Sequence, residues 1–168
     1  MAMESPGFGD KNRRFDKTYM QMAFIWSSNS YCVRKKVGVL IVKDGMIISD
    51  GFNGTPRGRP NRCEDDTGET FWEVIHAEAN ALMKLARSGN SSLGATMYTT
   101  LSPCRDCSKL ILQSGINRLV YERAHSDDSG LRLLEHAGVE IVHLPLSVSD
   151  MLPFEDLANR LVSEKSAR

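Results

Sequence analysis

The stretches HAEANALMKLA, residues 76–86, and SPCRDCSKLI, residues 102–111, each join a short polar motif to the start of an apolar segment. The apolar residues recur with the three- and four-residue spacing of a helix that buries one face. Pro103 is well placed for a first helical turn, where the missing backbone N–H costs nothing. We therefore expect helices over about 74–88 and 103–114, with one polar motif at the start of each.

The rest of the chain supplies strands and further helices. VGVLIVKDGMIISDGFNG, residues 37–54, places Asp44-Gly45 between two runs of β-branched residues, which is a strong hairpin signal. The other expected elements are helices over 14–29 and 126–138, a long loop over 55–70, and strands over 95–101, 118–122 and 139–144. Strands alternate with helices after residue 71, so the sequence predicts an α/β fold with parallel pairing in its second half.

Length and composition predict one globular domain. The 168 residues are 41% hydrophobic and 25% charged, which is enough to bury a core. The 21 basic and 21 acidic residues cancel, so no excess positive charge favours nucleic acid as a partner. No apolar run is long enough for a membrane span, and the polar N-terminus does not look like a signal peptide, so we expect a cytoplasmic protein. The expected core is 14–146, between a flexible N-terminus, 1–12, and a C-terminal helix, about 150–164.

The two polar motifs together predict a catalytic zinc site. Cys104 and Cys107 lie in the first turn of a helix, where the helix dipole favours thiolates. His76 lies at the start of the other helix and can reach a metal ion just beyond that helix end. One His and two Cys leave the fourth tetrahedral position open for water, and Glu78 is then free to transfer protons.

Other interpretations of the cysteines remain open. A Cys-x-x-Cys pair after a strand can be a redox pair, although that role has no use for His-Ala-Glu. A closed structural zinc site could take its fourth ligand from Cys32, Cys63 or His125. A non-catalytic, zinc-stabilised nucleotide-binding module would contain the same motifs. Disulfides are not expected in a chain without a secretory signal, so Cys32 and Cys63 are predicted to be ordinary thiols.

The order His-x-Glu…Pro-Cys-x-x-Cys is the signature of zinc-dependent nucleobase deaminases. From about residue 15 to residue 145 the chain resembles the deoxycytidylate (dCMP) deaminases of the cytidine deaminase-like superfamily. Four stretches carry the resemblance: CVRKKVGVLIV, ISDGFNGTPRG, HAEANAL and TMYTTLSPCRDCSKLILQSGINRLVY. It implies a three-layer α/β/α fold with a five-stranded mixed sheet, a homo-oligomer that is often a hexamer, and hydrolysis of dCMP to dUMP and ammonia for dTTP synthesis. The alternative within the superfamily is a cytidine or tRNA adenosine deaminase.

The same resemblance implies roles for individual residues. It assigns zinc to His76, Cys104 and Cys107 and the proton transfer to Glu78. It places the substrate against Asn53, Ala77, Ser102 and Pro103. Asn53 could equally be a turn residue. A monophosphate needs a cation, for which Arg34 is the first candidate, followed by Lys36 and Arg57, although such a charged run is also typical of solvated surface.

Further sites follow from the resemblance alone. Many family members respond to dCTP and dTTP, and the candidates for an effector site are Phe52, Gly54 and Arg87. His125 lies close to the place where the family has a substrate-facing aromatic residue. Some relatives bind a second, structural zinc through cysteines near Cys32 and Cys63 together with histidines. Residues 64–75 contain no histidine, so we expect one catalytic ion and no second zinc.

Overall fold

The computed structural model describes residues 8–151 and residue 159. Its helices are α1 (Phe8–Ser27), α2 (Ala77–Ala86), α3 (Arg105–Gln113) and α4 (Ser129–His136). Its strands are β1 (Gly38–Lys43), β2 (Met46–Phe52), β3 (Thr96–Leu101), β4 (Arg118–Arg123) and β5 (Glu140–His143). They form one sheet in the order β2-β1-β3-β4-β5, in which β1 is antiparallel to β2 and β3, and β3, β4 and β5 run parallel.

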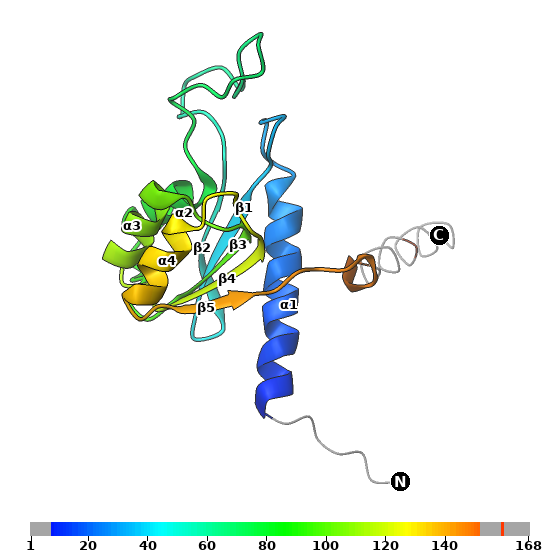
Figure 1. Ribbon diagram of the computed structural model, residues 1–168, viewed down its shortest axis with the longest axis vertical. Coiled ribbons are helices and arrows are strands. Elements are labelled where there is room, and N and C mark those ends of the chain that lie inside the picture. The colour runs from blue at the N-terminus through cyan, green and yellow to red at the C-terminus, as the bar shows by residue number, and fades with distance from the viewer. Residues whose placement is uncertain (1–7, 152–158, 160–168) are drawn as a thin grey trace.

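The sheet lies between two helical layers, which confirms the predicted three-layer α/β/α fold. Helix α1 covers one face, and α2, α3 and α4 cover the other (Figure 1). Because side chains alternate along a strand, β1 supplies both cores. Val39 and Ile41 pack with the residues of α2 and α3, whereas Leu40 and Val42 pack against α1. Within the described residues, no helix is long and apolar enough to cross a membrane.

The hairpin agrees with its local sequence signal, whereas the starts of two helices differ from the prediction. Asp44 and Gly45 have φ angles of 50° and 75°, as a two-residue hairpin turn requires, so the predicted hairpin is confirmed. Helix α2 begins at Ala77 and not near residue 74, because Ile75 pairs with Gly54 in an isolated β-bridge. Helix α1 begins at Phe8 and not near residue 14, so it extends into the first 12 residues.

Strand β2 and helix α2 pack backbone against backbone. A Cβ atom at Gly51 would lie 2.2 Å from the Ala77 carbonyl oxygen and 2.7 Å from the Ala81 nitrogen. Asn80 Nδ2 donates to the Phe52 carbonyl oxygen at 2.9 Å. These contacts fix the start of α2 relative to the end of β2.

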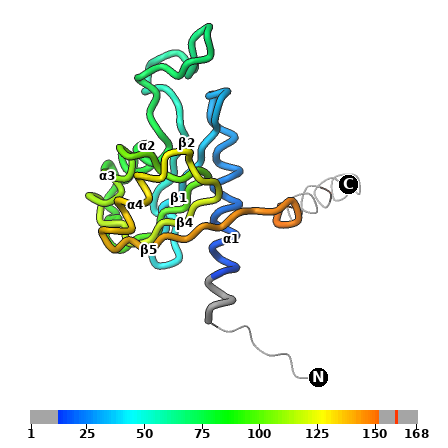
Figure 2. The backbone as a smooth tube through the Cα atoms, in the orientation of Figure 1, coloured from blue at the N-terminus to red at the C-terminus, as the bar shows by residue number. Residues whose placement is uncertain are grey.

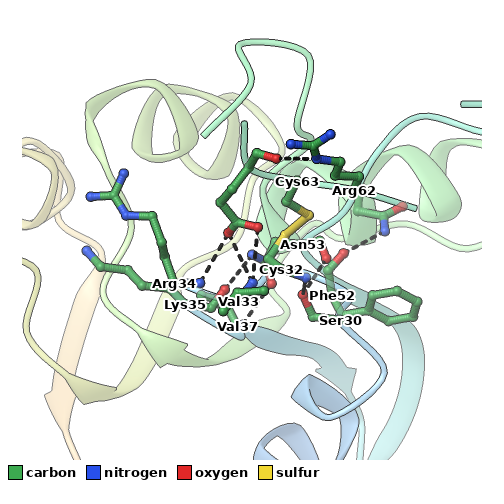
Figure 3. Close-up of a disulfide and its surroundings, with 12 residues drawn as sticks. Ser30, Cys32, Val33, Arg34, Lys35, Val37, Phe52, Asn53, Arg62 and Cys63 are labelled. Atoms are coloured by element: carbon green, nitrogen blue, oxygen red, sulfur yellow. Dashed lines mark hydrogen bonds between the residues drawn. A yellow bond between two sulfur atoms is a disulfide. The ribbon is translucent and has the colours of Figure 1, made fainter. Parts of the chain in front are cut away.

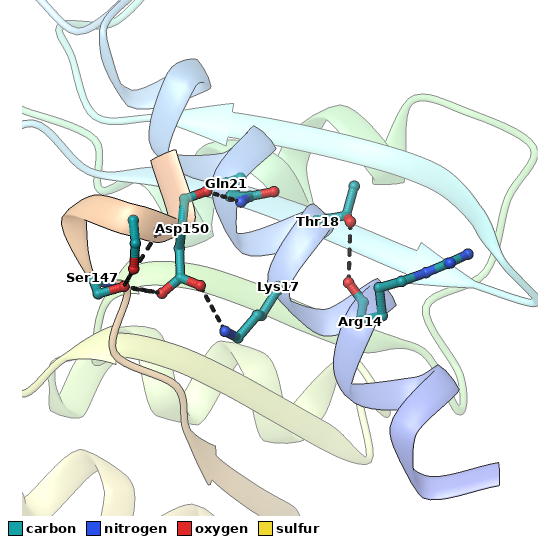
Figure 4. Close-up of polar contacts among 7 residues, drawn as sticks. Arg14, Lys17, Thr18, Gln21, Ser147 and Asp150 are labelled. Carbon is teal, nitrogen blue, oxygen red and sulfur yellow. Dashed lines mark hydrogen bonds and ion pairs between the residues drawn. The ribbon is translucent and has the colours of Figure 1, made fainter. Parts of the chain in front are cut away.

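The segment after β5 returns to α1 (Figure 2). Lys17 Nζ pairs with Asp150 Oδ1 at 2.6 Å, and Gln21 donates to the Asp150 carbonyl oxygen (Figure 4). Ser147 donates to the same carboxylate through its N–H and its hydroxyl, at 2.8 and 2.6 Å. The predicted C-terminal helix, about 150–164, lies outside the described residues except for positions 150, 151 and 159.

Candidate active site

The predicted metal ligands meet at the adjacent starts of α2 and α3. His76 is the N-cap of α2, Cys104 is the N-cap of α3, and Cys107 lies in the first turn of α3. His76 Nδ1 lies 3.5 Å from Cys104 Sγ and 3.5 Å from Cys107 Sγ. A zinc ion with ordinary bond lengths and tetrahedral angles holds a nitrogen and a sulfur about 3.6 Å apart. The three donor atoms therefore fit one zinc ion.

Helix α4 holds the start of α3 in place from behind. A Cβ atom at Gly130 would lie 2.5 Å from the Pro103 carbonyl oxygen and 3.0 Å from the Cys104 carbonyl carbon. Arg105 Nε also pairs with Asp127 Oδ2 at 3.0 Å, just before α4. The position of Cys104 therefore depends on a close backbone contact that a side chain at residue 130 would prevent.

The two cysteines share one proton, so that Cys104 is the thiolate and Cys107 is the thiol. The pKa of Cys104 is lowered to about 3, because its sulfur accepts hydrogen bonds from the Cys107 thiol and from His76. The pKa of Cys107 is raised, because its proton bonds the Cys104 sulfur and because the thiol is buried. The pKa of His76 is raised, chiefly by its hydrogen bond to Cys104. A zinc ion requires both sulfurs as thiolates, so binding it releases a proton from Cys107.

Glu78 lies beside this cluster and is almost completely buried, with 4% of its surface exposed. Burial raises the pKa of its carboxyl, so the group holds a proton more readily than an exposed glutamate. Cys32, Cys63 and His125, the alternatives for a fourth ligand, do not belong to the cluster of His76, Cys104 and Cys107. In the part of the chain that the structure describes, the ligand count is therefore that of an open site.

A pocket of about 240 Å³ lies in front of the ligands. Its lining includes most of the predicted site residues: Arg34, Asn53, His76, Ala77, Glu78, Ser102 and Cys104. Pro103 is fully buried and is not part of the lining. Lys36 and Arg57 are not part of the lining, whereas Lys35 and Glu64, which no motif singles out, are. The pocket thus lies between the metal ligands and a wall that includes Arg34, Lys35, Asn53 and Glu64 and carries charged side chains.

Asn53 connects that wall to the sheet. Its Oδ1 accepts from the Val37 N–H, and its Nδ2 donates to the Lys35 carbonyl oxygen, both at 2.8 Å. Its own carbonyl oxygen accepts from the Ser30 hydroxyl at 2.8 Å. The side chain therefore holds residues 30–37 against the end of β2, and among the described residues one amide hydrogen and one lone pair have no partner.

A disulfide links Cys32 to Cys63 and so connects the two loops of the wall (Figure 3). The prediction of two ordinary thiols was therefore wrong. The two Cα atoms are 5.0 Å apart although 31 positions separate the residues in the chain. The adjacent carboxylate of Glu64 accepts from the Val33 N–H at 3.0 Å and the Arg34 N–H at 3.1 Å. No local pattern reveals such a pairing, because it depends on how two loops fold against each other.

Arg34 and Lys35 differ in their pairing. Arg34 Nη1 lies 3.3 Å from Glu69 Oε2 in an exposed ion pair. Among the residues that the structure describes, no carboxylate forms an ion pair with Lys35.

His125 lines the pocket beside Ser102. Its backbone N–H donates to Ser102 Oγ at 2.7 Å, and its Nδ1 accepts from the Asp127 N–H at 3.1 Å. When the ring is neutral, the proton therefore lies on Nε2. The side chain can offer a hydrogen-bond donor to a ligand.

The three effector-site candidates lie along helix α2. Phe52 packs edge-on against Trp26, with their ring centroids 6.5 Å apart, and Lys84 Nζ lies 5.7 Å from the centre of the Phe52 ring. Gly54 pairs with Ile75 just before α2. Arg87 is the C-cap at the opposite end of that helix, about 15 Å away by the rise of ten residues.

The comparisons with known proteins agree with this geometry. Residues 13–123 match the model of the cytidine and deoxycytidylate deaminase zinc-binding region. The chain is 35% identical to the deoxycytidylate deaminase of Enterobacteria phage T4, over 83% of this chain and 95% of that protein. It is 31% identical to the deoxycytidylate deaminase of Homo sapiens, over 84% of this chain and 86% of that protein.

A solved structure is also similar. It is the dCMP deaminase from the cyanophage S-TIM5 in complex with dCMP and dUMP. The similarity has a TM-score of 0.76 and 41% sequence identity, and it covers 78% of this chain and 97% of that one.

Proposed function

The chain belongs to the cytidine and deoxycytidylate deaminase family, and on this premise we propose that it catalyses the zinc-dependent hydrolysis of dCMP to dUMP and ammonia. The observation that carries the proposal is that three zinc donor atoms and the buried carboxylate of Glu78 lie at one pocket. The phage T4 relative and the cyanophage protein with bound dCMP and dUMP support the choice of substrate.

His76, Cys104 and Cys107 would hold the zinc ion through one nitrogen and two sulfurs. When bound, zinc supplies a Lewis acid that makes water a nucleophile at neutral pH. The two helix N-termini direct their positive ends towards the thiolates and offset part of the charge of the site.

Glu78 would move the protons of the reaction. Its carboxylate takes a proton from the attacking water and passes it to N3 of the cytosine ring as the oxygen adds to C4. It then transfers the second proton of that water to the amino group, which leaves as ammonia, and the ring becomes a uracil. Burial raises the pKa of this carboxyl, which makes its carboxylate a stronger base than that of an exposed glutamate and so suits it to accept the proton of the water.

The opposite wall would recognise the nucleotide. We assign the 5′-phosphate to Arg34 and Lys35, with Arg34 exchanging its exposed partner Glu69 for the phosphate. The free hydrogen and lone pair of the Asn53 amide suit a sugar hydroxyl. Ala77 and Ser102 line the pocket near Glu78 and can offer backbone groups to the base.

The test is ammonia release from dCMP, deoxycytidine, cytidine, dCTP and an adenosine-containing stem-loop. We expect dCMP to have the highest kcat/KM, at least about 100-fold above deoxycytidine, because deoxycytidine has no phosphate for the two cations to bind. Formation of dUMP is followed by chromatography in the same samples. Turnover of cytidine with none of dCMP would overturn the assignment.

Assembly, regulation and location are finer proposals. We propose a homo-oligomer, with a hexamer as the form that the family resemblance favours. Apolar side chains on α1 that are more than a third exposed support a self-association surface: Phe15, Met22, Ile25 and Trp26. Light scattering should give a multiple of 18.7 kDa.

We further propose that dCTP and dTTP are effectors, which their effect on the initial rate of the reaction tests. We also propose a cytoplasmic location, where free dCMP is available.

A further inference from the structure

The pocket wall that faces the metal ligands is built from two loops. Residues 30–37 lead from α1 into β1, and residues 53–76 lead from β2 into α2 (Figure 3). Both segments contribute to the pocket lining, among them Cys32, Lys35 and Glu64. Because neither segment belongs to a helix or a strand of the sheet, their relative position depends on the contacts between them.

Two adjacent contacts hold the loops together. The disulfide links Cys32 to Cys63, and both residues are 1% exposed. The next residue, Glu64, accepts the backbone N–H groups of Val33 and Arg34. The covalent bond therefore brings Glu64 to the segment that carries the two cations of the wall.

The other contacts between the two loops either lie at the base of the longer loop, where Asn53 bonds the backbone of Lys35 and Val37, or are exposed. The bridge between Gly54 and Ile75 closes the base of the loop, at 3.1 and 2.8 Å, but it leaves the residues between them to other contacts. The ion pair of Arg34 with Glu69 is exposed, so water and salt weaken it. Without the disulfide, the middle of the loop would be attached to residues 30–37 mainly through exposed polar contacts.

We propose that the Cys32–Cys63 disulfide is a positioning element of the substrate pocket, so that substrate affinity depends on the thiol–disulfide state of this pair. The inference rests on the proposed function, because dCMP is the ligand whose binding changes. The step is thiol–disulfide exchange with a small thiol such as glutathione. One glutathione thiolate attacks a protein sulfur and the other protein sulfur leaves and takes a proton. A second glutathione then resolves the mixed disulfide, which gives two protein thiols and glutathione disulfide.

The reaction centre lies on the other side of the pocket. Glu78, Cys104 and Cys107 lie on or at the ends of helices that pack on the sheet, and none of them contacts the disulfide through a hydrogen bond. Reduction should therefore raise KM while leaving kcat nearly unchanged. By thermodynamic linkage, bound nucleotide must protect the disulfide from reduction by the factor by which reduction weakens the equilibrium binding of that nucleotide.

The experiment uses the zinc-loaded protein in buffers of glutathione and glutathione disulfide. Thiol titration after denaturation in a chelator should count two free thiols of the four cysteines in the oxidised protein. On reduction we expect the KM for dCMP to rise about fivefold or more, with kcat within about twofold. Zinc content, measured at each ratio, should stay at one ion per chain.

The matched control is the double variant Cys32→Ser with Cys63→Ser, which should show the KM of the reduced protein and no response to glutathione. A wild-type KM that stays constant while the thiol count changes from two to four would overturn the inference and leave the proposed function intact. So would four free thiols with two zinc ions per chain in the protein as purified, because the pair would then bind metal. Failure of the oxidised protein to turn over dCMP would overturn the proposed function, and this inference with it.

Discussion

The two sides of the pocket are held by different kinds of contact. On the ligand side, His76 and Cys104 are helix caps, and the helices that carry them are fixed by backbone contacts at Gly51 and Gly130. On the wall side, two loops are held by the amide of Asn53, by one carboxylate and by a disulfide. Under the proposed function, the helix layer would carry the chemistry and the loops would recognise the nucleotide. Substitutions on the two sides should therefore change different kinetic constants.

The largest effect should come from Glu78→Gln on the ligand side. The amide keeps the size of the side chain and removes the group that moves protons, so kcat for dCMP should fall about 10²- to 10⁴-fold. Zinc content and KM should stay near the wild-type values, because the amide leaves the ligands and the wall in place. Ammonia release and metal analysis measure both. Unchanged turnover would remove Glu78 from the mechanism.

The next largest effect should come from Gly130→Ala, which introduces a Cβ atom 2.5 Å from the Pro103 carbonyl oxygen. Helix α4 or the backbone at Cys104 must then shift. We expect a loss of about 1–3 kcal/mol in the free energy of unfolding and a zinc affinity about tenfold lower. Urea unfolding and chelator competition measure these. Gly89→Ala is the control, because its Cβ would meet nothing within 4 Å. Equal zinc affinity in both variants would contradict a positioning role for Gly130.

A smaller effect, on the wall side, should follow from Glu64→Ala. The substitution removes the acceptor for two backbone N–H groups, and a hydrogen bond to a charged group contributes about 1.5 kcal/mol or more. Since both N–H groups can turn to water, we expect KM for dCMP to rise about three- to tenfold with kcat unchanged. Asp66→Ala, in the same loop, should leave KM as it is. Steady-state kinetics distinguish these results from a general loss of activity, which would show that the two sides are not independent.

The smallest effect is a pH dependence at the junction of α3 and α4. The pKa of Asp127 is lowered to about 2, because Ser129 donates to its carboxylate and Arg105 lies beside it. A carboxyl with a lowered folded-state pKa stabilises the folded chain above its unfolded pKa, about 3.9, and this contribution is lost as pH falls through about 2. Asp127→Asn should therefore lower Tm slightly at pH 6 and less at pH 3. An equal difference at both pH values would rule out this carboxylate as the source.

Most of the fold could be predicted because its signals are local. Asp44 and Gly45 determine the hairpin, and the spacing of apolar residues identifies α2 and α3. The start of α2 was placed too early, because the apolar spacing continues through residues 74 and 75 while Ile75 pairs with Gly54. A contact across more than twenty residues decided that boundary, and no periodicity within the helix could reveal it.

The same distinction applies to the site. The zinc ligands could be predicted because each lies in a motif at a helix start, and the two helices begin at one edge of the sheet. The wall could not, because Cys32 meets Cys63 only after two loops have folded against each other. Asn53 was expected at the substrate, and that role stays a prediction, whereas the structure shows its side chain holding the backbone at Lys35 and Val37.

The close packing at Gly51 has a consequence for redesign. The contact there fixes the end of β2 to the start of α2. The loop from Asn53 to His76 therefore begins and ends at fixed positions. Segments of other lengths and compositions could be grafted between these two ends. A library of such grafts could contain proteins that bind other ligands, with the arrangement of the metal-binding residues unchanged.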